Sequence, residues 1–500
     1  MKLNRLLMPA LLLMAMTGCI NDADVPGGGG AIDGKDGDVT FSIIVSNSDG
    51  STRTDNGTVD DSGIHDLGNA NEYKVNNVRL YLFNSLDNKF IKSIPLTNLG
   101  SAEILNSYYA SYNSKNIAVD PGSYRIFAIA NEPKVYTPVD IDNFMSNLDD
   151  IYASGAIKSV PDNGFVMTNR GKESPDVTVI LGQKQTISIT LERVVAKIVF
   201  AKNKSAYSVV DQKGSTYATV TPTNFRFVNL TKNYYVFRHV AQLSDGDDTP
   251  ASIPFKFDEH FGIIPNDNGY AIDPNFFNKN KSSVKELGKT IYVNPLVLTD
   301  SNSAYETMPG QYDPTNDALK NNFTSIYCLE NCMFRPVQLQ GYTTGIIIKC
   351  NLVPNNCLDE TGVPVPSIPT TVYYYNANFY VNTTAIKNAG GQIPASGDYA
   401  TDAELAQYGI KKFAKTGGGN FACYYNYWIK HFDDQKDGSG VMEYAIVRNN
   451  IYNVTITKIL GIGDPNPNVD PEIPVDKVGY LDATFSVKPW VVRGQDAELK

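Results

Sequence analysis

The chain has 500 residues, and its 53 acidic residues outnumber its 43 basic residues, which gives a formal net charge of −10. A single hydrophobic core rarely includes a chain of this length, so we expect two or three domains. Lysine and arginine form no cluster, and this excludes nucleic-acid binding, because contacts to phosphates require grouped cations.

The N-terminus has the pattern of an export signal. A basic start precedes an apolar run at 6–16, which is too short to cross a bilayer as a helix. Two small residues and Cys19 follow, a pattern that resembles the lipobox of bacterial lipoproteins, although Met16 replaces the more usual leucine. We therefore expect residues 1–18 to be a cleaved signal peptide and Cys19 to be lipidated, with an ordinary signal peptide as the alternative.

The first half of the chain is predicted to form strands and one helix. A segment rich in Gly and Asp at 20–38 precedes the first strand, and a polar loop at 46–71 follows it. Runs of strand-forming apolar residues predict strands at 39–45, 78–83, 124–130, 185–191 and 194–200. A helix capped by Asp140 is predicted at 139–152, because apolar residues recur there at helical spacing. These elements predict a first domain that ends near residue 203.

The second half is predicted to continue in the same way with longer loops. Strands are expected at 345–349, 372–375, 442–447, 452–459 and 481–487. Thr401 and Glu404 form a capping-box pattern at the start of a short helix at 402–408. Four prolines at 463–477 predict an extended linker that joins no sheet, because proline lacks the N–H of a ladder. Many strands with two short helices predict an all-β fold of β-sandwich domains.

No motif for catalysis or metal binding stands out. The four histidines lack a metal-ligand spacing and lie at His65, His239, His260 and His431. Residues 286–290 end like a phosphate-binding loop, but Ser283 replaces its first glycine. Residues 433–438 begin like a calcium loop, but Tyr444 replaces its final glutamate. We therefore predict no catalytic residue, cofactor or metal, although two carboxylates of a glycosidase could stand anywhere among the acidic residues.

Five cysteines follow Cys19, at Cys328, Cys332, Cys350, Cys357 and Cys423. An odd number does not make a complete disulfide framework, and a chain of this size does not need one. We expect buried structural cysteines in preference to a metal site, and the formation of one or two disulfides stays open.

Six segments spread along the chain carry a resemblance to a known family. They are PGSYRIFAIAN at 121–131, LERVVAKI at 191–198, YCLEN at 327–331, GIIIK at 345–349, VRNNIYNVTI at 447–456 and KPW at 488–490. Together they resemble the FimA/Mfa-type major fimbrillins, which polymerise into type V pili. The segment at 447–456 is the most specific, and the resemblance covers nearly the whole chain.

The resemblance implies a structural subunit of two transthyretin-like β-sandwich domains in tandem, at 38–203 and 204–478. It implies a precursor anchored in the outer membrane through the lipid on Cys19, and later an extracellular fimbrium that supports adhesion. The partners that it implies are copies of the chain itself, accessory fimbrial subunits, and an Arg-specific protease that removes the N-terminal strand.

Arg53 is the expected cleavage site. It is the only arginine between Arg5 and Arg79, and it lies in the polar loop directly after the first strand. Exposed loops of small polar residues are where proteases cut. We expect residues 19–53 to be removed and the mature chain to begin at Thr54, with an ordinary surface arginine as the alternative.

Residues 479–500 are expected to donate a strand that replaces the removed one in a neighbouring subunit. The sequence TFSV at 484–487 resembles TFSI at 40–43. Because side chains alternate across a strand, one face of the donor, which extends to Trp490, would present Leu481, Ala483, Phe485 and Val487, as the first strand presents Val39, Phe41, Ile43 and Val45. The alternative is that this strand completes its own second domain.

Other functions stay open at this point. One is a surface lipoprotein that binds glycans on a stacking platform of Tyr424, Tyr425, Tyr427 and Trp428. Another is a tip or anchor subunit of a fimbrium in place of a stalk subunit. A third is a secreted hydrolase, which no motif supports.

Overall fold

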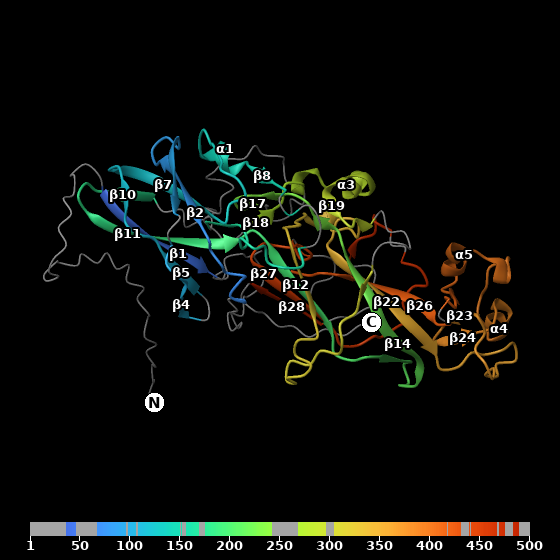
Figure 1. The fold of residues 1–500 in the computed structure, drawn as a ribbon. Helices are drawn as coiled ribbons and strands as arrows, with labels where there is room; N and C mark the ends of the chain where they lie inside the picture. The colour runs from blue at the N-terminus through green and yellow to red at the C-terminus, as the bar shows by residue number, and fades with distance from the viewer. Residues whose placement is uncertain are drawn as a thin grey trace, which may run out of the picture.

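The computed structural model describes residues 37–46, 68–96, 99–106, 109–150, 152, 157–169, 176–242, 269–296, 305–417, 419–431, 440, 442–467, 470–475 and 484–489. The molecule is elongated, with β10 (Asp176–Val179) near one end and α4 (Thr383–Asn388) near the other (Figure 1). No helix among the described residues is long and apolar enough to span a membrane.

The first half of the chain forms a ten-stranded sheet. Its strands are β1 (Gly37–Ser46), β2 (Val78–Asn84), β3 (Phe90–Leu96), β4 (Glu103–Asn106), β5 (Tyr109–Asn113), β6 (Ile117–Val119), β7 (Gly122–Ala130), β9 (Met167–Asn169), β10 and β11 (Lys184–Arg193). The order is β3-β2-β7-β9-β11-β1-β5-β4, with β10 paired to β7 and β6 paired to β1. The first strand among the described residues, β1, therefore lies inside the sheet and not at its edge.

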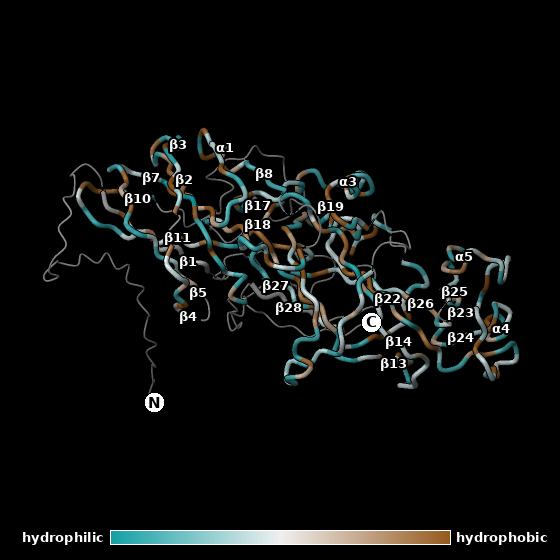
Figure 2. Tube along the Cα trace, in the orientation of Figure 1, coloured by the Kyte–Doolittle hydropathy of each residue, from teal (hydrophilic) through white to brown (hydrophobic). Residues whose placement is uncertain are grey.

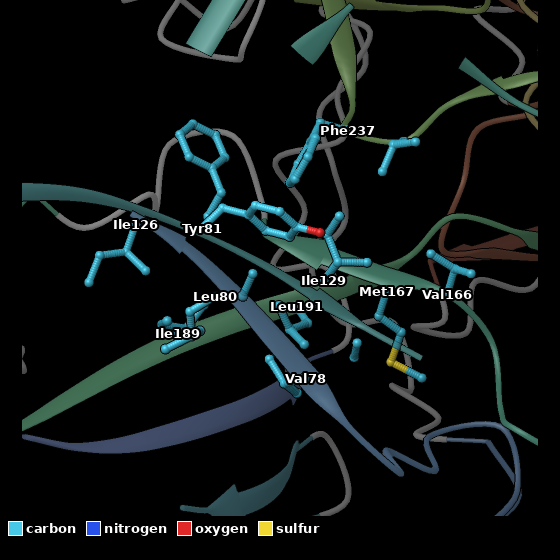
Figure 3. Packing of buried hydrophobic residues seen from close by; sticks show 14 of the residues in the cluster. Val78, Leu80, Tyr81, Ile126, Ile129, Val166, Met167, Ile189, Leu191 and Phe237 are labelled. Carbon is cyan, nitrogen blue, oxygen red and sulfur yellow. The ribbon is translucent and has the colours of Figure 1, made fainter. Parts of the chain in front are cut away.

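Apolar side chains of these strands form a first hydrophobic cluster. Ile189 and Leu191 of β11 lie close to Val78 and Leu80 of β2 within it (Figure 3). The helix α1 (Ile141–Met145) adds its buried Phe144 to the same cluster. Apolar and polar residues alternate along part of β11, whereas β2 is buried at four successive positions, Leu80–Phe83, so both of its faces are covered.

The helix predicted at 139–152 is wrong in its length, because α1 ends at Met145. Its start is confirmed, since the Asp140 carboxylate accepts a hydrogen bond from the backbone N–H of Asn143 at 3.0 Å. Beyond the helix the chain forms β8 (Leu148–Asp149), which pairs with β16 (Tyr234–Tyr235). Pairing with a segment far along the chain overrides the helical spacing there, and no local pattern reports it.

The second half contains two sheets that face each other. One has the order β21-β12-β27-β28, and the other has the order β13-β14-β22-β26 with β20 paired to β14. Their bounds are β12 (Ala196–Lys202), β13 (Tyr207–Val210), β14 (Thr216–Val228), β20 (Glu306–Thr307), β21 (Thr324–Cys328), β22 (Gly345–Pro354), β26 (Phe421–Trp428), β27 (Asn450–Ile456) and β28 (Thr484–Pro489). A second hydrophobic cluster contains residues of both sheets. This is the arrangement of a β-sandwich.

Smaller elements surround these sheets. The other strands are β15 (Leu230–Thr231), β17 (His239–Gln242), β18 (Gly269–Ile272), β19 (Tyr292–Val293), β23 (Thr371–Tyr375), β24 (Asn378–Tyr380) and β25 (Lys411–Ala414). The other helices are α3 (Val284–Ile291), α4, α5 (Asp402–Gln407), η2 (Phe276–Asn278), η3 (Lys281–Ser283), η5 (Arg335–Val337) and η6 (Gly397–Tyr399). Figure 2 shows hydrophobic residues along the interior strands of both halves and hydrophilic residues in many peripheral loops.

The predicted all-β class is confirmed, with more short helices than expected. The capping box of Thr401 and Glu404 is also confirmed at the start of α5. The strand predicted at 442–447 is wrong, because this segment is a turn followed by a single bridge from Ile446 to Asn331. Its apolar residues are buried in three different clusters, with Met442, Ala445 and Val447 in a third cluster, so their hydrophobicity reflects packing and not a strand.

The two strands expected to close the first domain lie in different sheets. β11 belongs to the first sheet, whereas β12 pairs with β21 and β27 in the second half. Val195 contributes to the first hydrophobic cluster and Ala196 to the second. The change of core thus occurs before residue 203, and the division into two tandem domains stays a prediction.

Candidate strand-exchange groove

The strand β1 has hydrogen-bonded partners on both of its sides. It runs parallel to β11, from Asp38 opposite Lys184 to Val45 opposite Leu191. On its other side it runs antiparallel to β5 over Ser42–Ser46 and antiparallel to β6 over Gly37–Val39. We call the space that β1 fills between β11 and the β5–β6 pair the β1 groove. Without β1, the facing edges of β11 and of β5–β6 would be left unpaired.

The described side chains of β1 alternate as the sequence predicts. Val39 is 0% exposed and Phe41 is 1% exposed, whereas Thr40 between them is half-buried. The side chains of Ile43 and Val45 lie outside the described residues, so their orientation stays a prediction. Val39 and Phe41 belong to the first hydrophobic cluster, and β1 therefore completes the core of the first half.

A short segment after β5 fixes the position of β1 along the groove. The backbone N–H of Phe41 donates to Ser114 Oγ at 2.9 Å, and the backbone N–H of Ser114 donates to the carbonyl of Phe41 at 2.8 Å. The Thr40 hydroxyl donates to Asn116 Oδ1. Neither Ser114 nor Asn116 was predicted, because each lies more than 70 positions from its partner and belongs to no local pattern.

Apolar side chains line both sides of the β1 groove, and they belong to the first hydrophobic cluster. Ile187, Ile189 and Leu191 on β11 are buried, as are Ala110 and Tyr112 on β5. The Tyr112 hydroxyl donates to a backbone carbonyl at 2.9 Å, and burial raises its pKa above the ordinary value. A strand that replaces β1 would meet an apolar surface already positioned by its own contacts.

The C-terminal strand β28 occupies an edge of the second half. It runs antiparallel to β27, from Asn450 opposite Pro489 to Thr455 opposite Thr484. Within the described residues it has this one neighbour, since β28 ends the order β21-β12-β27-β28. Within a single chain, β28 therefore pairs with the second half of that same chain. This is the alternative to strand donation that the sequence left open.

Some of the predicted site residues lie in the described part of the chain and others do not. Phe485 and Val487 lie in β28, of which the backbone alone is described. The other predicted site residues, Cys19, Arg53, Thr54, Leu481, Ala483 and Trp490, lie outside the described residues. The structure therefore places β1 and the backbone of the predicted donor, and the lipidation and cleavage sites stay predictions.

The predicted free linker at 463–477 is in fact attached to the body of the protein where it is described. Tyr424 and Asp464 exchange two backbone hydrogen bonds, of 2.8 and 2.9 Å. Further along, the N–H of Gly341 donates to the carbonyl of Pro471 at 3.0 Å. Proline cannot donate to a ladder, but its carbonyl still accepts, so the prolines do not exclude such pairing.

Three of the six family-like segments, at 191–198, 327–331 and 447–456, meet at the junction of the two halves. Arg193 donates from Nε to the carbonyl of Glu72 at 2.8 Å and from Nη1 to Asn449 Oδ1 at 3.0 Å. The fully buried Glu72 carboxylate accepts from Lys197 Nζ at 2.6 Å and from the Tyr327 hydroxyl at 2.5 Å. Glu72, which follows the predicted cleavage loop, is the member of this cluster that the sequence did not indicate.

The charge of Glu72 is stabilised by its partners. Burial by itself would raise the pKa of the Glu72 carboxyl, but the Lys197 charge and the hydrogen bonds from Lys197, Tyr327 and the backbone of Asn69 lower it below the ordinary value. Nearby, Arg448 is buried and donates to Glu330 at 2.7 Å. These segments are thus carriers of a buried polar network and not of a catalytic site.

The aromatic residues proposed as a glycan platform do not lie together on the surface. Tyr425, Tyr427 and Trp428 are buried, and Tyr424 is half-buried. Tyr425 and Tyr427 face the second hydrophobic cluster, whereas Trp428 belongs to another cluster with Val475. Side chains divided between two cores do not form one stacking surface.

The predicted buried cysteines are confirmed within the described part of the chain. All five have free thiols, and they are Cys328, Cys332, Cys350, Cys357 and Cys423. Burial raises the pKa of the Cys328 thiol to about 12. Among the described residues, no group of three or more His, Cys, Asp or Glu side chains could hold a metal ion. His239 contacts the carbonyl of Met145 and His431 contacts the Tyr452 hydroxyl, while His65 and His260 lie outside the description.

Two protein-family models match the chain. The model described as "Major fimbrial subunit protein (FimA)" matches residues 38–228, which include the β1 groove. The model described as "Major fimbrial subunit protein type IV, Fimbrillin, C-terminal" matches residues 419–496, which include β26, β27 and β28. No curated protein matches the sequence.

Several solved structures resemble the chain at low sequence identity. A putative cell adhesion protein from Parabacteroides distasonis is 12% identical, with 91% of this chain and 99% of that chain covered and a TM-score of 0.45. A fimbrilin (FimA) from Porphyromonas gingivalis is 14% identical, with 92% and 99% covered and a TM-score of 0.39. The tip fimbrial protein Mfa3 from the same species is 14% identical, with 85% and 99% covered and a TM-score of 0.32. On the strength of the two family models, the chain belongs to the major fimbrial subunits, which are structural proteins of surface fimbriae and not enzymes.

Proposed function

We propose that this chain is the stalk subunit of a fimbrium and that it polymerises by exchange of a strand between copies. Cleavage after Arg53 by an Arg-specific protease releases β1, and residues 479–500 of another copy then fill the β1 groove. The observation that carries this proposal is the place of β1, which is paired on both sides although it is the first strand of the chain. The lipid on Cys19 holds the precursor at the outer membrane until cleavage.

The pairing geometry gives a direction to the exchange. In the β1 groove, eight residues pair with β11, while five pair with β5 and three with β6. In its own chain, β28 pairs with β27 through six of its residues. Within the described residues, this pairing is on one side of β28 alone. Each ladder hydrogen bond contributes about 0.5–1.5 kcal/mol net. A donor that leaves β27 for an open groove therefore gains a second ladder, which helps to offset the cost of association.

The sequences of the two strands set the register of the exchange. Residues 38–43 read DVTFSI and residues 482–487 read DATFSV, so that Phe485 corresponds to Phe41. In this register Ser486 takes the place of Ser42, which lies opposite Ser188 on β11. In its own chain Ser486 lies opposite Asn453. One donor residue thus has two different partners before and after the exchange.

Cysteine cross-linking tests this change of partner. Ser486→Cys with Asn453→Cys should form a bond within one chain before processing. Ser486→Cys with Ser188→Cys should form covalent ladders between chains after processing, because residues directly opposite in a sheet lie within disulfide range. Thr186→Cys, two positions away on the same face of β11, is the off-register control. Ladders that form equally with Thr186→Cys refute the register, and no ladders in assembled fibres refute the exchange.

A stalk subunit needs both an acceptor groove and a donor strand, and this favours the stalk over a tip or anchor subunit. An anchor should keep its lipid in the assembled fimbrium, whereas a stalk subunit should begin at Thr54. N-terminal sequencing of fimbriae sheared from cells separates these functions. A chain that still begins at Cys19 in the fibre contradicts the stalk assignment.

A further inference from the structure

The segment just before the donor strand is held in a defined position on the second half. The N–H of Gln340 donates to the carbonyl of Ile473 at 2.9 Å, and the N–H of Val475 donates to the carbonyl of Gln338 at 3.1 Å. Leu339 and Pro474 form an antiparallel bridge between these bonds. We call residues 338–341 together with residues 470–475 the clasp.

The inner side of the clasp is fixed to the core. The side chain of Asn229 donates to the carbonyls of Gln340 and Thr343 at 2.8 and 2.7 Å. Gln338 donates from Nε2 to the carbonyl of Gly440 at 2.6 Å. Since Asn229 and Gln340 are themselves buried, residues 338–341 form a firm support for the segment that pairs with them.

The outer side of the clasp fits this support closely. Val475 is buried in a hydrophobic cluster with Trp428 and Ile347. A Cβ atom added at Gly341 would lie 2.6 Å from Pro471 Cβ and 2.6 Å from Val284 Cγ2. A glycine is required there because the two segments approach too closely for any side chain.

We infer that the clasp is a positioning site for polymerisation, which fixes the chain at Val475, so that the arm that carries the donor strand to another subunit begins at Asp476. This inference rests on the proposed function. Eight residues then separate Val475 from Thr484, and fully extended they span roughly 26–29 Å. The next hydrogen bond towards the N-terminus is that of Asn466, whose side-chain amide donates to Asp402 Oδ2 at 2.8 Å. Opening of the clasp would add at most residues 467–475 to the arm, or roughly 30–32 Å of extended chain.

The clasp therefore limits the distance and direction between successive subunits. A short arm with a fixed root gives a stiff fibre, whereas a longer arm gives each subunit more freedom relative to the next. The donor strand itself fills the same groove in both cases. The clasp should consequently govern the stiffness of the fibre and not the resistance of the subunit contact to detergent.

The test compares fibres of the full processed chain that carry Gly341→Val with fibres that carry Gly417→Val. The added side chain at Gly417 meets no atom within 4 Å, so this variant is the matched control. We expect Gly341→Val fibres to resist detergent as the unchanged protein does but to bend more, with a persistence length at least about twofold shorter in electron micrographs. Gly417→Val fibres should keep the unchanged persistence length. Equal bending of all three fibres overturns the inference.

A second variant covers the case in which Gly341→Val fails to fold. Leu339→Cys with Pro474→Cys should lock the clasp by a disulfide across the bridge. The locked chain should polymerise into fibres of unchanged stiffness, because the arm starts beyond the lock. A locked chain that is cleaved but does not polymerise shows that the clasp must open, and this overturns the inference. Deletion of residues 479–500 separates the two proposals: fibres that form without them refute strand donation, whatever the clasp does.

Discussion

Replacement of Phe41 by alanine should weaken the precursor and leave the finished fibre unchanged. Phe41 is 1% exposed in the first hydrophobic cluster, and its backbone is held by Ser114. Loss of a buried phenylalanine side chain costs about 3–5 kcal/mol, through lost burial and the cavity left behind. If cleavage after Arg53 removes β1, a mature subunit made from the Phe41→Ala precursor has the same sequence as the unchanged one.

The assay is denaturant unfolding of the purified precursor, followed by heating of the assembled fibres in detergent. Phe41→Ala should lower the free energy of unfolding of the precursor by about 3–5 kcal/mol and should not alter the temperature at which fibres dissociate. Phe485→Ala should instead lower the temperature at which fibres dissociate, because in the proposed fibre this residue takes the place of Phe41. Leu86→Ala is the control, since Leu86 is 92% exposed and its loss should change stability by less than about 0.5 kcal/mol.

Two results would refute this reasoning. Fibres from the Phe41→Ala precursor that dissociate at a lower temperature would show that β1 remains in the mature subunit. A Phe485→Ala chain with normal fibres would show that another segment fills the groove. Both measurements start from the full-length precursor, and neither depends on knowing the protease.

Three further predictions concern the precursor. Cys19→Ser should move the newly exported chain from the detergent phase to the aqueous phase in a partitioning experiment, and unchanged partitioning contradicts lipidation. Arg53→Ala should keep the chain monomeric and bound to the membrane, because β1 then stays in its groove, and normal polymers would contradict activation by cleavage. Glu72→Gln should lower the melting temperature at pH 7, because a buried pair that loses one partner costs about 3–5 kcal/mol. Since the pKa of Glu72 is lower in the folded chain than its ordinary 4.5, its contribution is present above that pH and is lost as the pH falls through the folded value. The unchanged protein should therefore lose more stability on acidification than Glu72→Gln does, and equal losses would contradict this role of Glu72.

The parts of the fold that were predicted from the sequence are those with a local cause. The alternation of Val39 and Phe41 reports a strand with one buried face, and Thr401 with Glu404 reports the start of a helix, because each pattern acts within a few residues. The strand expected at 442–447 was wrong because burial of its side chains in several hydrophobic clusters gives the same hydrophobic run without a ladder.

The parts of the candidate site that the sequence did not indicate depend on contacts between distant segments. Ser114 and Asn116 form hydrogen bonds with β1, and the backbone N–H of Gly341 donates to the carbonyl of Pro471. None of these three residues lies in a recognisable motif. The family-like segments were found, but their role was not, because a buried arginine such as Arg193 has no signature in the sequence that distinguishes it from an exposed one. The role of Arg193 depends on its partners Glu72 and Asn449, which lie far from it in the sequence.

The structure also explains why those segments matter to a polymer. In the proposed fibre, the incoming strand pairs with β11, and β11 continues through the buried Val194 and Val195 directly into β12. β12 pairs in parallel with β27, and the chain that leaves β27 passes through the clasp to the outgoing arm. The path from acceptor groove to donor strand therefore crosses the junction once, where Arg193 joins Glu72 to Asn449. Tension along the proposed fibre would act on this crossing in every subunit, and the hydrogen bonds and ion pair that Glu72 and Arg193 form there connect the two halves at that point.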